Sequence, residues 1–140
     1  MIRNGLIFSC IGVLAMIMVF SGVASASTNN VITVTTTDDV VNANDGQCSL
    51  REAIMTANNN SIALVGECAK GSANSTDIIQ LEGGETYNLT VAGDNEDFAQ
   101  TGDLDILDNA TPDVDIMVQA VGGTAVVKTN GLDRVWHIHG

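Results

Sequence analysis

Basic residues are scarce in this chain: five Lys and Arg residues stand against 17 Asp and Glu residues, and the net charge is −12. One of the five, Arg3, lies within the first 26 residues, so the rest of the chain carries four. Nucleic acids and anionic lipid surfaces both bind through a basic footprint. The charge balance therefore argues against these two classes of partner, although an acidic surface does not by itself identify another.

Aromatic residues and catalytic motifs are also few. Beyond residue 26 the aromatic side chains are Tyr87, Phe98 and Trp136, too few to predict a platform for sugar rings. The sequence has no G-x-S-x-G, no Cys/His couple and no phosphate-binding loop. Acidic and amide residues gather at 38–46, but the D-x-[DN]-x-[DN]-G pattern ending in Glu is absent, so we interpret them as a solvated loop instead of a calcium site. We accordingly predict neither a cofactor nor a metal ion, with calcium on the acidic loops as the alternative.

The first 26 residues have the layout of a secretory signal peptide. Arg3 supplies the positive charge, residues 5–20 are apolar, and Ala24-Ser25-Ala26 matches an A-x-A cleavage site. The alternative is an uncleaved membrane anchor, because the apolar run approaches the length of a span. We predict that the peptide is removed and that the protein is secreted or displayed at the cell surface. Contact with the membrane is then limited to residues 1–26 before cleavage.

One short stretch predicts a helix. Apolar residues recur at i, i+3, i+4 and i+7, which forms one face of a helix: Leu50, Ala53, Ile54 and Ala57. Ser49 in front of this face and Glu52 three residues later indicate a capping box. Asn58-Asn59-Asn60 should end the helix, because Asn tolerates the left-handed conformation at a C-cap. A helix of about nine or ten residues is not stable alone in water, so its apolar face must cover another element.

The remainder of the chain reads as short strands. Val31 to Thr37 alternates β-branched residues. Six further runs follow, separated by Gly, Asn and Asp turns: 77–81, 86–91, 103–107, 114–120, 125–128 and 134–139. No helical pattern lies between them, which argues against βαβ units and leaves a sandwich, a barrel or a β-solenoid. The Asn130-Gly131 turn suits a hairpin as well as a solenoid corner.

The stretch Cys48 to Ile54 reads CSLREAI, with Ala57-Asn58 following, and it resembles the CSLREA domain. Softer similarity continues at 102–106 (GDLDI) and 131–136 (GLDRVW), so that the resemblance covers roughly Thr33 to Gly140. This bacterial module precedes right-handed parallel β-helix repeats in exported surface proteins. The resemblance thus implies a mainly β chain in which residues 27–71, with one short α-helix, cap the N-terminal end of a parallel β-helix.

Residues 72–140 would then form the first coils. Strand segments of this total length make two or three coils at most, whereas a solenoid needs roughly three or more repeats. We therefore expect a truncated or partial surface protein. The predicted function is structural: an exported segment that caps and initiates a β-helix and is not an enzyme. The resemblance leaves a polysaccharide or protein of the cell surface or its surroundings open as a partner.

Cys48 and Cys68 flank the predicted helix. Export places them where disulfides form and persist, and a bridge would fasten the segment that carries the cap. A metal or redox pair is the alternative, but neither a neighbouring His nor a C-x-x-C spacing supports it. A further alternative is a buried Cys48 beside a free Cys68 thiol.

Two sets of polar residues bear on a second hypothesis, a β-helix carbohydrate-active enzyme (polysaccharide lyase or hydrolase) or an adhesin fragment. Asp103, Asp105 and Asp108 should form an acidic strip on the outward face of a strand, with Arg134, paired to Asp133, as the basic residue. His137 and His139 alternate along a strand and share a face, but no third metal ligand is in register with them. No motif supports catalytic geometry for these residues.

Overall fold

The computed structural model describes residues 29–42, 44–59, 67–107, 115–131 and 134–139. The predicted signal peptide lies outside these ranges, as do Asp108 and Asp133. The elements in chain order are β1 (Asn30–Thr33), α1 (Leu50–Asn58), β2 (Asp77–Glu82), β3 (Thr86–Asn88), β4 (Leu104–Leu107), β5 (Ile116–Val121), β6 (Val126–Lys128) and β7 (Trp136–His139). The described chain is therefore mainly strands with one short helix, as the sequence predicts.

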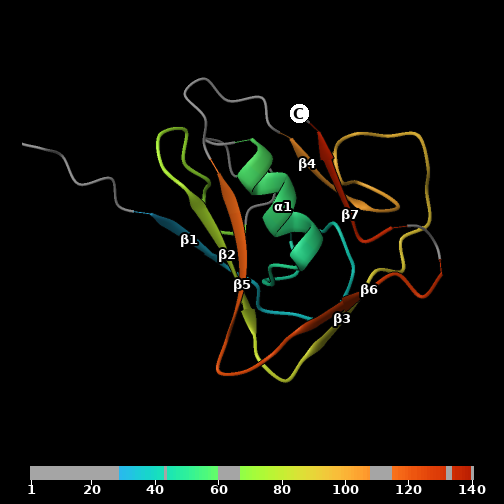
Figure 1. The fold of residues 1–140 in the computed structure, drawn as a ribbon, viewed down its shortest axis with the longest axis horizontal. Coiled ribbons are helices and arrows are strands. Elements are labelled where there is room, and N and C mark those ends of the chain that lie inside the picture. The colour runs from blue at the N-terminus through green and yellow to red at the C-terminus, as the bar shows by residue number, and fades with distance from the viewer. Residues whose placement is uncertain (1–28, 43, 60–66, 108–114, 132–133, 140) are drawn as a thin grey trace, which may run out of the picture.

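The strands form three small parallel sheets, in the orders β1–β2–β5, β3–β6 and β4–β7. In Figure 1 the sheets lie on three sides of α1. Helix α1 packs against β4, β2 and β1. Each sheet has free edges, so the described strands do not close into a barrel.

The apolar core lies between these sheets and the helix. In β2 alternate side chains are buried, at Asp77, Ile79 and Leu81. Ile79 is opposite Ile32 of β1 and Val118 of β5, so apolar side chains stack from strand to strand. This in-register stacking removes apolar surface from water, the main favourable contribution to folding.

Asp77 is the buried acidic residue at the start of β2. Its carboxylate accepts hydrogen bonds from the Ser72 N–H at 2.9 Å and from the Asn30 side chain at 3.3 Å. Burial raises the pKa of Asp77 above its ordinary value, although these hydrogen bonds act in the opposite direction. The same Asn30 side chain also donates to the Lys70 carbonyl, which ties the start of β1 to the approach to β2.

Strands β1 and β3 end earlier than the sequence predicts, because the backbone N–H groups that follow them bind elsewhere. The first predicted strand ends after Thr33; the Val34 N–H still binds Gln80, but the Thr35 N–H donates to the Cys48 carbonyl at 2.8 Å. The run predicted at 86–91 ends at Asn88. Beyond it, the N–H groups of Thr90 and Val91 both donate to an Asp39 carboxylate oxygen.

The turns after β2 and β5 stack directly on one another. A Cβ atom on Gly83 would lie 2.2 Å from the Gly123 nitrogen, so only glycine permits this approach. The Gly84 N–H donates to the Thr124 carbonyl at 2.8 Å, and Gly84 and Gly122 have φ of +93° and +81°. The two corners thus lie one above the other, with the positive φ at the second residue after β2 and at the first residue after β5.

The Asn130-Gly131 turn does not form a hairpin. Both residues have positive φ, as the central residues of a type I′ turn would. However, β6 before the turn pairs with β3, and β7 after it pairs with β4. The turn is therefore a corner between two sheets.

Candidate functional site

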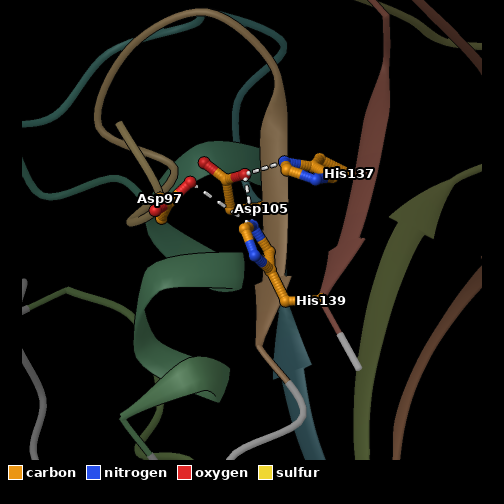
Figure 2. Close-up of side chains that lie close together, drawn as sticks. All are labelled: Asp97, Asp105, His137 and His139. Carbon is orange, nitrogen blue, oxygen red and sulfur yellow. Dashed lines mark hydrogen bonds and ion pairs between the residues drawn. The ribbon is translucent and has the colours of Figure 1, made fainter. Parts of the chain in front are cut away.

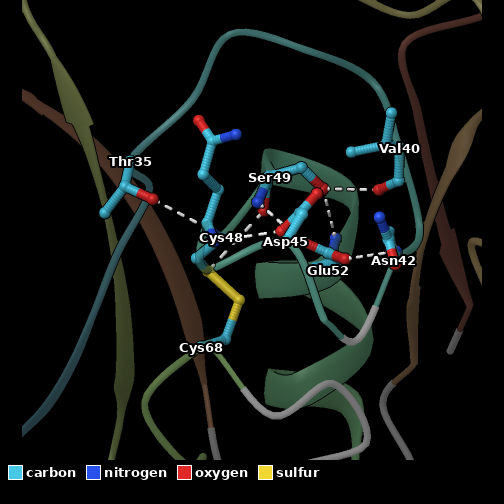
Figure 3. Close-up of a disulfide and its surroundings, with 9 residues drawn as sticks. Thr35, Val40, Asn42, Asp45, Cys48, Ser49, Glu52 and Cys68 are labelled. Carbon is cyan, nitrogen blue, oxygen red and sulfur yellow. Dashed lines mark hydrogen bonds between the residues drawn. A yellow bond between two sulfur atoms is a disulfide. The ribbon is translucent and has the colours of Figure 1, made fainter.

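The capping box at the start of α1 is present at the residues that the spacing indicates. The Ser49 Oγ accepts from the Glu52 N–H at 3.1 Å, and Glu52 Oε2 accepts from the Ser49 N–H at 2.8 Å. Figure 3 shows that both side chains also reach the preceding loop: Ser49 Oγ donates to the Val40 carbonyl at 2.7 Å, and Glu52 Oε1 accepts from the Asn42 N–H at 2.7 Å. The box therefore fixes residues 40–42 as well as the helix.

Cys48 and Cys68 form a disulfide in the structure, with a Cα–Cα distance of 5.0 Å (Figure 3). Cys48 directly precedes the helix N-cap, and its N–H donates to Thr35 Oγ1 at 2.8 Å. Both cysteines are buried. The bridge thus links the entry of α1 to the segment that leads into β2, and the thiols are not available as a metal or redox pair.

Helix α1 is buried on more than its apolar face. The predicted face (Leu50, Ala53, Ile54, Ala57) lies in the core, but every residue from Leu50 to Ala57 is buried. Residues 39–42 and 99–103 cover the polar side of the helix as well, through contacts with Arg51 and Glu52. Thr56 Oγ1 on that side has no hydrogen-bond partner among the described residues. At the other end, the helix stops within the asparagine run, as the sequence predicts. Asn59, the C-cap, is in the right-handed region (φ −93°), and Asn60 lies outside the described residues.

Arg51 and Asp39 form a buried ion pair that sequence reasoning did not find. The Arg51 guanidinium contacts Asp39 through Nε at 2.6 Å and through one terminal nitrogen at 3.1 Å, and the two side chains are 0% and 2% exposed. Arg51 also donates to the carbonyls of Ala99, Gly102 and Asp103. The pair therefore joins three separate segments: the loop before the helix, the helix itself and the loop before β4.

Asp39 is fully committed as an acceptor. Burial pushes the pKa of Asp39 upward, but the hydrogen bonds from Arg51 and from the backbone N–H groups of Val91 and Thr90 together hold it below its ordinary value. The only sequence feature that could have indicated this network is Arg51, the single basic residue of the helix. Asp39 lies 12 residues earlier, and no helical or strand spacing connects the two positions.

The acidic strip predicted on the outward face of β4 does not exist as such. Asp103 is 7% exposed and Asp105 is fully buried, so neither faces solvent as the strand pattern predicts; Asp108 lies outside the described residues. The loop before β4 folds back over Asp105, and the Ala99 N–H donates to Asp105 Oδ2 at 3.1 Å. Arg134 Nε lies 2.8 Å from Asp103 Oδ2. Arg134 thus contacts Asp103, and its predicted partner Asp133 lies outside the described residues.

Asp105 meets both histidines of the chain. His137 Nδ1 and His139 Nε2 each lie 3.0 Å from Asp105 Oδ1, and the two ring centroids are 3.9 Å apart. Asp97 completes the group, with Oδ1 at 3.8 Å from His139 Nε2 (Figure 2). One nitrogen or oxygen atom from each of these four residues lies within 4.8 Å of the other three. We call Asp97, Asp105, His137 and His139 the Asp–His cluster.

The sequence analysis singled out Asp105, His137 and His139 but did not predict that they lie together. His137 and His139 were expected to share a face, and they do. Asp105 reaches them because β4 pairs with β7, with Asp105 opposite His137. Asp97 lies on the loop before β4, and no spacing rule connects it to β7.

Comparison of the chain with protein-family models, with curated proteins and with solved structures finds no match. The likeness of residues 48–54 to the CSLREA domain therefore remains a prediction from the residues themselves. Among the described residues, no helix has the length and apolar character that a membrane span requires.

Proposed function

We propose that this chain is an exported, non-catalytic structural segment whose N-terminal part caps and initiates a parallel β-solenoid. One observation carries the proposal: β2, β3 and β4 pair in parallel, in the same order, with β5, β6 and β7. This is the relation that successive coils of a solenoid have, since each repeat contacts only its neighbours. The stacked glycine corners at Gly83 and Gly123 support the same relation.

The cap function rests on where β1 and α1 lie. Strand β1 pairs with the edge of β2 that β5 leaves free, so it covers the hydrogen-bonding groups of that edge. Helix α1 contacts β1, β2 and β4 and places Leu50 and Ile54 in the core. A sheet edge and an apolar end would otherwise face water, and both promote association between chains.

The opposite end differs in character. An open concavity of about 390 Å³ lies there, lined mainly by apolar side chains of β5, β6 and β7, including Val118, Val127 and Trp136. Strand β5 also has a free edge. These are the features onto which a further coil stacks, so the solenoid we propose has a closed end at α1 and a growing end at β5–β7.

Hydrogen exchange tests the cap. Ile54 in α1 is fully buried, whereas Ile138 in β7 is 71% exposed, so Ile54→Val and Ile138→Val remove the same methylene group from opposite environments. We expect Ile54→Val to lower stability by about 0.5–1.5 kcal/mol and to speed amide exchange first in β1, β2 and β4. Ile138→Val should change neither. Equal acceleration in all seven strands, or none, would contradict a cap at this end.

Export and the lack of catalysis need separate measurements. N-terminal sequencing of the protein from the culture medium or cell surface should show cleavage after Ala26. A screen against acidic and neutral polysaccharides, with and without calcium, should show no turnover. Turnover that Asp105→Asn abolishes would replace the structural proposal with an enzymatic one.

A further inference from the structure

We propose that the Asp–His cluster is a binding site for one divalent transition-metal ion, with zinc the best match. This goes beyond the structural function above and does not depend on it. The donor set is two imidazole nitrogens and two carboxylate oxygens. Imidazole with carboxylate suits zinc and its neighbours in the first transition row, whereas calcium takes oxygen ligands alone.

The distances already approach those of a coordination shell. Zinc binds His nitrogen and Asp oxygen at about 2.0–2.2 Å, so ligand atoms of a tetrahedral site lie roughly 3.3–3.5 Å apart. In the cluster, Asp105 Oδ1 lies 3.0 Å from His137 Nδ1 and 3.0 Å from His139 Nε2, and Asp97 Oδ1 lies 3.8 Å from His139 Nε2. All four ligand atoms lie within 4.8 Å of one another. Asp97 is the outlying member, and its side chain is 68% exposed on a loop, so it can close on an ion without disturbing the core.

The buried members are held in place by groups outside the cluster. Asp105 is fully buried, and the Ala99 N–H at 3.1 Å from its Oδ2 leaves Oδ1 directed at the two imidazoles. The β4–β7 pairing places Asp105 opposite His137 and Leu107 opposite His139, which fixes both rings on one face. Such support for the ligands is typical of metal sites, where groups behind the ligands orient them.

The charge around the cluster also favours a cation. Besides Asp97 and Asp105, a third carboxylate lies close by, since Asp103 Oδ2 is 4.0 Å from His137 Nδ1. The neighbouring basic residue, Arg134, forms an ion pair with Asp103. Without an ion, His137 Nδ1 and His139 Nε2 share one oxygen atom of Asp105, Oδ1. With an ion, each nitrogen and each carboxylate supplies a lone pair to it.

The expected role of the ion is structural. Four protein ligands complete a tetrahedral zinc site and leave no open position for a substrate. The ion would join the loop before β4, through Asp97, to β4 and β7. Arg51 already binds the same loop at the carbonyls of Ala99 and Gly102. The ion would add a second point at which this loop, which covers the helix, is held in place.

Zinc titration of the exported protein by isothermal calorimetry tests the proposal. The chain has two histidines in total, so His137→Ala and His139→Ala each remove one imidazole, and the double variant removes both. We expect one zinc ion per chain in the unmodified protein, and each His variant should weaken binding by at least about 100-fold. Asp97→Asn should weaken it roughly tenfold. Asp94→Asn, an exposed aspartate of the same loop outside the cluster, should leave it unchanged.

A spectroscopic probe guards against variants that fail to fold. Cobalt(II) in place of zinc should give the intense visible absorption of a tetrahedral site, and Asp97→Asn should shift or weaken it with the circular dichroism unaltered. No saturable binding, or equal binding by the double His variant, would overturn the proposal and leave the imidazoles as hydrogen-bond partners of Asp105.

Discussion

Arg51 Nε lies 2.6 Å from Asp39 Oδ1, and neither side chain is more than 2% exposed. Two charges so removed from water are tolerated only when each is paired and hydrogen-bonded. Here Arg51 also binds three carbonyls, and Asp39 also binds two backbone N–H groups. The pair thus holds together the loop before α1, α1 itself and the loop before β4.

Removal of Arg51 should destabilise the protein strongly. Arg51→Ala leaves Asp39 buried without its counter-charge, and we expect the free energy of unfolding to fall by about 3–5 kcal/mol in urea titration. Arg51→Lys should cause a smaller loss than Arg51→Ala, because the ammonium group keeps the charge but cannot make the bidentate contact with the carboxylate. Lys128→Ala is the matched control: this basic residue is exposed and should change stability by less than about 0.5 kcal/mol. A loss below about 1 kcal/mol for Arg51→Ala would show that the pair contributes little.

The stability should decline in acid partly through Asp39. Its folded pKa lies below the ordinary 3.8, so the unfolded state takes up the proton more readily. The contribution is thus fully present above about pH 4 and is lost as the pH falls through the folded pKa. Asp77 acts in the opposite sense, since its raised pKa favours the folded state on protonation.

Asp39→Asn isolates this effect. The variant should be less stable than the unmodified protein at pH 7, and the difference should shrink as the pH falls below the ordinary pKa of 3.8 and Asp39 itself is protonated. Urea unfolding at several pH values measures it. A difference that stays constant down to pH 2 would mean that Asp39 does not titrate as its contacts imply.

Substitutions in the capping box should lower the free energy of unfolding by different amounts. Ser49→Ala removes one acceptor at the helix start and should reduce stability by about 1–2 kcal/mol. Glu52→Ala leaves the buried N–H of Ser49 and the partly buried N–H of Asn42 without an acceptor, so we expect a larger loss, about 2–4 kcal/mol. Glu52→Gln keeps one acceptor oxygen and should be intermediate. Thermal or urea unfolding gives the order, and an equal effect of all three substitutions would contradict the two-sided role of Glu52.

The Cys48–Cys68 disulfide should be intact in protein isolated without reductant. Mass spectrometry under non-reducing conditions should find Cys48 and Cys68 oxidised, and reduction should lower the free energy of unfolding by about 3 kcal/mol, as the loop-entropy model gives for a bridge of this span. The double variant Cys48→Ser/Cys68→Ser should not respond to reductant. Ready alkylation of both residues in the native protein would show that the bridge does not form.

The sequence by itself determined the local structure. The strand runs lie within a few residues of those observed, and the capping box fixes the start of α1, because both depend on period and on side chains three residues apart. The cysteine pair was also predictable, because Cys48 and Cys68 are the two cysteines beyond residue 26. These features depend on near neighbours or on a small number of choices.

Only the tertiary structure decided which distant residues meet. The parallel β4–β7 pairing places Asp105 beside His137, and the fold of the loop before β4 adds Asp97 and buries Asp105. The same loop covers the polar side of α1 and receives Arg51. No periodicity links residues 39 and 51, or 97 and 139, because their contact depends on the path of the whole chain between strands. The helix, the turns and the alternation of the strands are local, whereas the buried ion pair and the Asp–His cluster exist only once the sheets have stacked.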